Sequence, residues 1–314
     1  MRAAVVTELI GPDGVQIRDL PEPEGDLIVD VHAVGISFPD LLLSKGEYQL
    51  KPEVPFTLGV DFAGVVRRDA GGFAAGDRVA GCLPYRGGAE VVASAPDFVF
   101  PLPDSISFVQ GAALPMNYLT AEFALGERGQ VQPGETVLVH GAAGGVGTAT
   151  LQVARGMGAR TIAVVSTEEK AEVARAAGAD EVVLTEGFQE AVQALGGADV
   201  VLDVVGADLF TDSLRCLNPT GRLLVVGFAG GSIPEVKVNR LLLNNIDVRG
   251  VGWGAYAMVR PGFMREQWQR LLPMLESGVI VPPVHDVRPI EKISAALHDM
   301  DQRRTLGKTV LTLT

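Results

Sequence analysis

Glycines crowd a short stretch between two well-patterned segments, and they are the residues of this chain that point most plainly to chemistry. The stretch reads TVLVHGAAGGVGTATLQVARGMG and spans residues 136–158. Its first five residues form an apolar run typical of a buried strand, and the segment after the glycines has the spacing of an amphipathic helix. Between them, Gly144, Gly145 and Gly147 predict a tight turn whose backbone N–H groups can approach a ligand closely.

A turn of this kind is where many proteins bind the pyrophosphate of a dinucleotide. The helix predicted to begin near residue 146 would point its positive end at the phosphates. The usual G-x-G-x-x-G pattern reads here A-x-G-x-x-G, with Ala142 in the first glycine position. The pattern follows a predicted strand and opens a predicted helix, which favours a nucleotide site over a tight turn without a ligand. We expect the nucleotide to be held by Ala143, Gly144, Gly145 and Val146.

The residues that follow the second strand bear on which nucleotide binds. A chain that binds NAD carries Asp or Glu there for the ribose 2′-hydroxyl, whereas this chain has Ser166 and Thr167, with Lys170 one helical turn later. Two hydroxyls and an ammonium would hold a 2′-phosphate, which predicts NADPH rather than NADH. A second interpretation is a helix N-cap, in which Glu168 and Glu169 favour the positive end of the helix. The two interpretations are compatible.

The chain has three stretches that differ in their residue patterns, and these residues lie in the second of them. Residues 1 to about 115 hold short valine-rich runs separated by Pro and Gly turns, which indicates a small, mostly β domain. From about 116 to 252, strand and helix patterns alternate, which predicts right-handed βαβ units and a doubly wound parallel sheet. We expect its strands at 136–140, 160–165, 181–184, 200–204, 222–227 and 246–251. The last stretch, 253–314, holds two helices and a final strand, KTVLTLT, that we expect to return to the first domain.

Composition and charge narrow the classes of partner. The 314 residues are 47% hydrophobic and 20% charged, with a formal net charge of −12. An acidic surface repels nucleic-acid phosphates and anionic lipid, so neither nucleic acid nor a membrane surface is an expected partner. The two cysteines, Cys82 and Cys216, have no pair or cluster spacing, which suits a reducing cytoplasm. The sequence shows neither a signal peptide nor an apolar run of membrane-spanning length.

The order and spacing of several motifs resemble one family along nearly the whole chain. The chain is similar to the medium-chain dehydrogenase/reductases, in the zinc-free quinone oxidoreductase branch that includes zeta-crystallin. This resemblance implies a GroES-like catalytic domain, a Rossmann cofactor domain and an active-site cleft between them. The matching stretches are VGISFPDLLLSKGEY, PFTLGVDFAGVV, GDRV, GGAEVV, LTAEFAL, VLVHGAAGGVG, EEKAEVARAAGAD, VLDVVG and GRLLVVG.

The departures from the zinc-dependent members are informative. Those enzymes place a Cys before a GTD-like stretch and a His-Glu pair after a glycine. Here Ser37 and Phe38 stand in the first region, and Val60 stands where the His would be, beside Asp61. A catalytic zinc needs three protein ligands and an open position, and these residues do not supply them. The four histidines form no ligand-spaced cluster, so we expect no catalytic metal.

Without a metal, the chemistry would rest on the cofactor and on a hydrogen-bond donor for the acceptor. Tyr48 matches the tyrosine that zinc-free relatives place beside the nicotinamide, and that related enoyl thioester reductases use as proton donor. The alternative is an aromatic side chain that serves only packing. Ser37 replaces an Asn common in this branch and would hydrogen-bond ribose or substrate. Asp40 is more consistent with a residue that ties its loop together than with a base.

Further cofactor contacts follow from the resemblance. Thr120 matches a threonine that contacts the nicotinamide. The remaining positions end strands on the ligand side of a doubly wound sheet, where glycines also serve tight turns. These positions are Val205, Gly227, Phe228 and Ala229.

Three functions fit an intact NADPH motif. The first is a reductase of quinones or related activated alkenes such as enones. The second is a 2-enoyl thioester reductase acting on acyl-CoA, for which Lys45, Lys51 and Arg86 are the candidate phosphate contacts. The third is a non-enzymatic NADPH-binding protein of the crystallin type. The apolar segment NNIDVRGVGWG is predicted at the edge of the cofactor sheet, which favours a homodimer.

Overall fold

The chain divides into two compact units, which a computed structural model describes over residues 1–313. The first unit holds Met1–Asn117, Pro261–Gln269 and the described chain from Pro282 onward. The second unit holds Tyr118–Arg260 and Arg270–Val281. The stretch expected as a return segment at 253–314 is therefore divided between the two units.

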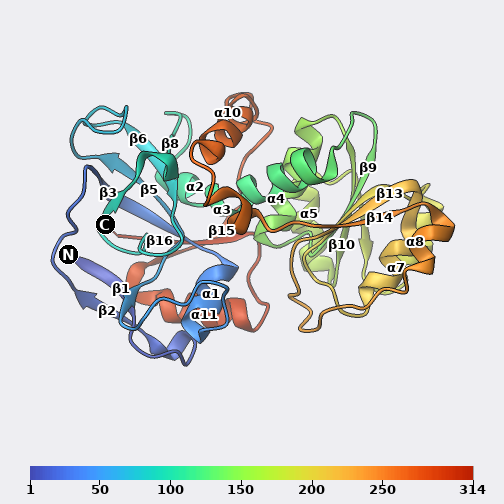
Figure 1. Cartoon of the computed structure of the whole chain (residues 1–314), viewed down its shortest axis with the longest axis horizontal. Helices are drawn as coiled ribbons and strands as arrows, with labels where there is room; N and C mark the ends of the chain where they lie inside the picture. The colour runs from blue at the N-terminus through green and yellow to red at the C-terminus, as the bar shows by residue number, and fades with distance from the viewer. Residues whose placement is uncertain (314) are drawn as a thin grey trace. The chain divides into compact units, whose positions relative to one another are not determined.

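The first unit is built on two sheets. The larger sheet has the order β15-β16-β3-β5-β6-β8, with β7 paired to β3, and the smaller has the order β2-β1-β4. The last strand, β16, pairs antiparallel with β3, so the red end of the chain joins a sheet that begins in blue (Figure 1). The strands of this unit are β1(Arg2–Val6), β2(Val15–Asp19), β3(Leu27–Ile36), β4(Phe56–Thr57), β5(Asp61–Val66), β6(Arg78–Cys82), β7(Val91–Ser94), β8(Val99–Pro101), β15(Val284–Pro289) and β16(Lys308–Thr312).

Helices of the first unit are short and close the sides of these sheets. Helix α1(Phe38–Lys45) follows β3 directly and lies beside α11(Ile293–Asp301), as Figure 1 shows. Helix α2(Phe108–Ala112) packs on β3 and β5 and precedes α3(Pro115–Glu122), along which the chain passes from the first unit into the second. Trp268, in α10(Phe263–Glu276), stacks on Phe100 and donates its indole N–H to the carbonyl of Pro101 at 2.9 Å.

The second unit is a six-stranded sheet in which every pair is parallel. Its order is β11-β10-β9-β12-β13-β14, so the strand order reverses between β9 and β12. All six predicted strands form, with ends that differ by a few residues. They are β9(Thr136–His140), β10(Arg160–Val165), β11(Glu181–Leu184), β12(Ala198–Asp203), β13(Leu217–Val225) and β14(Asp247–Gly250).

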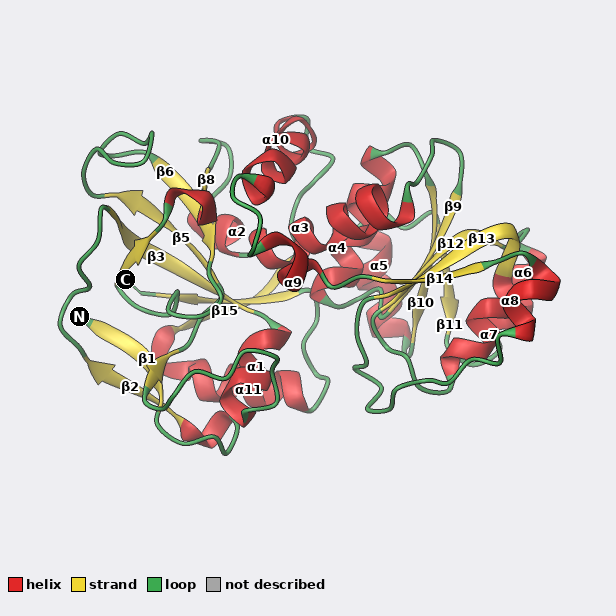
Figure 2. Ribbon diagram, viewed as in Figure 1, coloured by secondary structure: helices red, strands yellow, loops and turns green. Residues whose placement is uncertain are grey.

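Helices cover both faces of this sheet, as a doubly wound fold requires (Figure 2). Phe188, Phe210 and Leu214 come from the helices on one face and pack against the strand residues Leu138 and Val201. This burial explains why the strands are nearly continuous apolar runs. The helices are α4(Gly145–Gly156), α5(Glu168–Ala176), α6(Phe188–Ala194), α7(Leu209–Cys216), α8(Asn239–Asn244) and α9(Trp253–Ala257).

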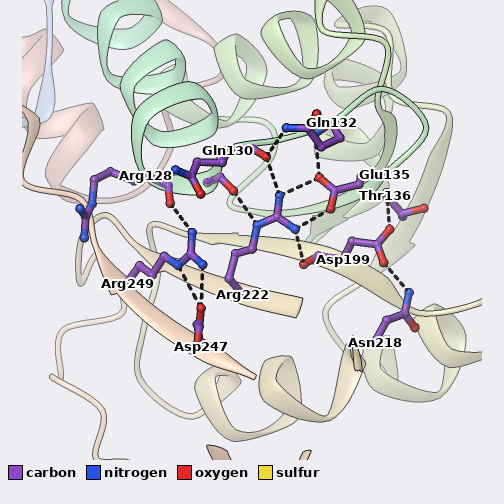
Figure 3. A network of polar contacts seen from close by, with 11 residues as sticks. Arg128, Gln130, Gln132, Glu135, Thr136, Asp199, Asn218, Arg222, Asp247 and Arg249 are labelled. Carbon is purple, nitrogen blue, oxygen red and sulfur yellow. Dashed lines mark hydrogen bonds and ion pairs between the residues drawn. The ribbon is translucent and has the colours of Figure 1, made fainter. Parts of the chain in front are cut away.

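A buried arginine organises the amino edge of the sheet (Figure 3). Arg222 forms a bidentate ion pair with Glu135, in which Nη1 lies 2.6 Å from Oε1 and Nη2 lies 2.6 Å from Oε2. The hydrogen bonds from this arginine hold the pKa of Glu135 below its usual range. The same guanidinium donates to the carbonyls of Gly129 and Gln130, where the π-helix η3(Phe123–Gly129) ends. A helix end leaves backbone carbonyls without a partner inside the helix, and here an arginine side chain donates hydrogen bonds to two of them. The network lies at the amino ends of the strands, whereas the candidate cofactor site lies at the opposite edge, where the strands have their carboxyl ends.

No helix within residues 1–313 is long and apolar enough to cross a membrane.

Candidate cofactor and acceptor sites

The glycine turn leaves the carboxyl end of β9 and opens α4, as the sequence predicts. Gly141 has a positive φ of 61°, and a Cβ on Gly147 would collide with the carbonyl oxygen of Gly141, so a side chain fits poorly at both positions. Gly144 is the N-cap of α4 and supplies no side-chain acceptor. Because that helix end lacks a side-chain cap, its first N–H groups suit an external anion such as a pyrophosphate.

Ser166 and Thr167 follow β10 at the same edge of the sheet. Thr167 is the N-cap of α5, and its hydroxyl accepts the backbone N–H of Lys170 at 3.3 Å. The ammonium of Lys170 donates to the Ser166 hydroxyl at 3.2 Å. The N-cap interpretation is therefore realised in the structure. It also places the exposed Ser166 hydroxyl beside the ammonium of the partly exposed Lys170, which is the chemistry a 2′-phosphate requires.

Asp203, which the sequence reasoning missed, shapes the loop after β12. One of its carboxylate oxygens accepts the backbone N–H groups of Val205 and Gly206, both at 2.8 Å. Its backbone carbonyl accepts the N–H of Val226, at the start of the loop that holds Gly227, Phe228 and Ala229. A Cβ on Gly227 would have no neighbour closer than 3.6 Å, so the space above it is open. The predicted positions after β12 and β13 thus share one edge with the glycine turn.

His140, the last residue of β9, is a second missed residue at this edge. Its Nε2 lies 2.7 Å from the Ser213 hydroxyl, which donates its own proton to the carbonyl of Leu209. Nε2 must therefore carry the hydrogen. Burial lowers the pKa of His140 to about 4, so the ring stays neutral at physiological pH. We interpret His140 as a support that joins the strand before the glycine turn to α7.

The first unit contains a buried ion pair at the end of β3. The Lys308 ammonium lies 2.7 Å from a carboxylate oxygen of Asp61 and also donates to the Ser37 hydroxyl. Ser37 in turn donates to Asp61 at 2.8 Å. All three side chains are buried, with 4% of the Lys308 side chain and none of the Asp61 side chain exposed. The second oxygen of Asp61 accepts the N–H of Met116, at the start of α3, at 2.8 Å.

Asp40 ties the neighbouring loop together, as expected. Its carboxylate accepts the N–H of Ser37 at 2.9 Å and that of Gly59 at 3.1 Å, which fixes the start of α1 against the residue before Val60. Burial raises the pKa of Asp40 to about 7, and the nearby Asp61 adds to the increase. Because both carboxylate oxygens are engaged by backbone donors, Asp40 serves the loop rather than proton transfer.

Tyr48 is half-buried, and Cys82 and Asp40 are its charged or polarisable neighbours. Burial raises the pKa of the Tyr48 hydroxyl, and the nearby Cys82 and Asp40 raise this pKa further. The hydroxyl therefore keeps its proton throughout the neutral range and can donate a hydrogen bond. Burial likewise raises the pKa of the Cys82 thiol, with Asp61 as the next cause, so the thiol is kept neutral.

The sequence could have revealed part of what was missed. Lys308 is the one charged residue in the otherwise uncharged run KTVLTLT, and a charge in a buried strand requires a partner. Which partner it meets depends on the antiparallel register of β16 with β3, in which Thr309 lies opposite Ile36.

Within residues 1–313, no group of three His, Cys, Asp or Glu side chains is placed to hold a metal ion.

Comparison with known proteins relates the whole chain to one family. Residues 23–104 match the alcohol dehydrogenase GroES-like domain, and residues 145–277 match the domain described as zinc-binding dehydrogenase. Quinone oxidoreductase-like protein 2 of Rattus norvegicus is 39% identical over 99% of this chain and 92% of its own length.

Two solved structures extend the comparison to the fold. A probable oxidoreductase from Mycobacterium abscessus superposes with a TM-score of 0.89 at 41% identity, covering 99% of this chain and 98% of its own. The quinone oxidoreductase from Thermus thermophilus, also solved in complex with NADPH, has a TM-score of 0.85 at 35% identity and covers all of both chains. The chain therefore belongs to the medium-chain dehydrogenase/reductases, in the quinone oxidoreductase branch of that family of oxidoreductases.

Proposed function

We propose that this oxidoreductase uses NADPH to reduce a quinone or a related activated alkene, and that it does so without zinc. The observation that carries the proposal is the buried cluster of Ser37, Asp61 and Lys308 in the unit that also holds Tyr48. The chain is similar to a quinone oxidoreductase-like protein over 99% of its length. Ammonium, hydroxyl and carboxylate satisfy one another in the cluster, and the proton-bearing Tyr48 hydroxyl remains as a donor for the acceptor.

The chemistry divides between cofactor and protein. When bound, NADPH supplies the hydride. A quinone or an enone is activated by its own conjugation, so the protein has only to orient it and to stabilise the oxygen that becomes negative. Tyr48 supplies the hydrogen bond to that oxygen. The uncapped start of α4, the exposed Ser166 and the partly exposed Lys170 hold the phosphates at the carboxyl edge of the sheet.

The residues at the positions where zinc-dependent members of the family hold their metal support zinc independence. Ser37 stands in the place of a cysteine thiolate, and its hydroxyl is bonded to the Lys308 ammonium. A cation already neutralises Asp61, so a second cation at this place would be repelled. Exhaustive chelation is expected to leave NADPH oxidation unchanged, and elemental analysis is expected to find no zinc. Stoichiometric zinc whose removal abolishes turnover would contradict this part of the proposal.

Cofactor preference provides a second prediction. NADPH is expected to bind more tightly than NADH by about 1–3 kcal/mol, the range of hydrogen bonds to charged groups. The preference arises because Ser166, Thr167 and Lys170 replace the carboxylate that an NAD site would present. Calorimetric titration of both cofactors measures it, and Lys170→Met is expected to narrow the gap. Equal dissociation constants in the wild type would show that Thr167 and Lys170 serve only to begin α5.

Acyl-CoA is the less favoured acceptor because one of its candidate contacts is already engaged. The Lys45 ammonium pairs with Asp301 at 2.6 Å, which leaves Lys51 and Arg86 for the phosphates of coenzyme A. The deciding experiment follows NADPH absorbance with a quinone, an enone, crotonyl-CoA and no acceptor. Oxidation that depends on the quinone or the enone supports the proposal. Oxidation with crotonyl-CoA alone would move the assignment to enoyl thioester reduction, and binding without any oxidation would indicate a non-enzymatic NADPH-binding protein.

We also infer that two copies associate through the second unit. Strand β14 is the last in its sheet, so one edge has no partner strand within the described chain. The segment before it exposes Leu242 and Leu243, which are 76% and 74% accessible, together with Val238. Pairing with a second copy would satisfy the edge and cover this apolar surface. Light scattering is expected to give a dimer mass, and a double Leu242→Lys/Leu243→Lys variant a monomer mass; a monomeric wild type at micromolar concentration would reject the inference.

A further inference from the structure

Helix α3 carries two little-exposed polar side chains that lack a hydrogen-bond partner in the part of the chain that the structure describes. Asn117 is 6% exposed and Thr120 is 7% exposed. Neither side chain makes a hydrogen bond within residues 1–313, whereas the other buried polar or charged side chains in that range each have a partner. Among single atoms of the described residues, Nδ1 of His140 and Oγ1 of Thr305 are also buried without a hydrogen bond. Thr120 is the residue that resemblance places against the nicotinamide; nothing in the sequence marked Asn117.

Polar side chains with so little exposure and no protein partner must bond to water or to a ligand. Neither side chain is sealed in the core, because within the described chain no polar atom of Asn117 or Thr120 is both fully inaccessible and unpartnered. Residues three apart on a helix lie on one face. Asn117 and Thr120 therefore place an amide and a hydroxyl, one turn apart, on one face of α3.

The surroundings of Asn117 indicate which part of the reaction it serves. It directly follows Met116, whose N–H is held by Asp61 in the cluster of Ser37 and Lys308. Tyr48 lies near the same cluster, since Cys82 and Asp40 both influence its hydroxyl. Asn117 is thus joined through Met116 to the cluster assigned to the acceptor, and it precedes Thr120 by one helical turn of α3.

We propose that Asn117 is a specificity-determining residue whose side-chain amide donates a hydrogen bond to the carbonyl oxygen of the acceptor. A carbonyl oxygen has two lone pairs and accepts two donors, of which the Tyr48 hydroxyl is one and the Asn117 Nδ2 the other. As hydride arrives, that oxygen gains negative charge and both bonds strengthen. The assignment rests on the proposed reduction of a quinone or enone.

The test combines stability and kinetics on Asn117→Leu, which keeps the size of the side chain and removes its polar atoms. Because the amide bonds to nothing in the described protein, the melting temperature of the ligand-free variant is expected to stay the same or to rise. Its kcat/KM for a quinone or an enone is expected to fall about tenfold, the effect of one neutral hydrogen bond near the top of its range. NADPH affinity is expected to be unchanged. Asn117→Asp, which replaces the donor by an acceptor, is expected to lose more.

Thr120→Val is the matched control on the same helix face. It is expected to weaken NADPH binding, with a smaller change for the acceptor, which is the reverse of the Asn117→Leu pattern. A clear fall in melting temperature for Asn117→Leu, or unchanged kcat/KM for every acceptor, would overturn the assignment. A wild type that oxidises NADPH with no acceptor would contradict both the proposed function and the role of Asn117 in it, whereas an active wild type with an indifferent Asn117→Leu variant would contradict this inference alone.

Discussion

Replacing Tyr48 by phenylalanine is expected to reduce turnover about 100-fold, the usual cost of losing one donor to a developing oxyanion. The ring and its packing remain, and only the hydroxyl is removed. NADPH affinity should hardly change, because the hydroxyl serves the acceptor and not the phosphates. The loss should be larger for an enone, which must receive a proton at carbon, than for a quinone, whose oxygens water can protonate.

Steady-state rates with both acceptors measure the effect, and Tyr85→Phe is the matched control. Tyr85 also lies in the first unit, where its ring packs edge-on against Phe56, and it has no assigned part in the reaction. Its variant is expected to keep wild-type rates. Unchanged turnover of Tyr48→Phe on both acceptors would leave Tyr48 as a packing residue, and catalysis would then rest on cofactor placement alone.

Lys308→Met is expected to lower the free energy of unfolding by about 3–5 kcal/mol, the range for breaking a buried ion pair on one side. Methionine fills similar space, so the loss comes from the Asp61 carboxylate, which stays buried without its cation. Lys45→Met is the matched control, because Lys45 pairs with Asp301 in a partly exposed position. That variant should lose no more than about 1 kcal/mol.

A double variant separates the charge from the packing. Lys308→Met/Asp61→Asn removes both charges, so it should recover a large part of the stability that Lys308→Met loses, as measured by urea unfolding. If the single variant is as stable as Lys45→Met, or if the double variant is less stable than the single one, the buried pair is not what holds the end of the chain to β3.

The fold was largely predictable because its signals are local. The strand–glycine–helix order at 136–158 and the alternation that follows it depend on residues near in sequence, and the parallel sheet formed with every predicted strand. The π-helix η3 was not predicted, because its end is satisfied by Arg222, which lies far along the chain. A contact of that kind leaves no periodic trace in the sequence.

The candidate site divides in the same way. The cofactor edge was predicted from its glycines and from Ser166, Thr167 and Lys170, although the support given by His140 and Asp203 was not. In the acceptor region the sequence points only to Tyr48, which stays a prediction, and to Ser37, whose hydroxyl bonds to Asp61 and Lys308 in the structure. Lys308 reaches Ser37 through the register of the last strand, and Asn117 becomes notable only once the burial and the partners of the polar side chains are known. Such facts follow from tertiary structure and not from spacing.

Transfer of deuterium from cofactor to acceptor tests the central claim most directly. The metal-depleted protein would be incubated with NADPH deuterated at C4 of the nicotinamide, on the transferred face, and with an enone, and the product would be examined by mass spectrometry and NMR. The proposed function predicts one deuterium at the β-carbon of the reduced alkene and none at the α-carbon, which receives a solvent-derived proton. A product without cofactor deuterium, or a reaction that proceeds only after zinc is restored, would contradict it.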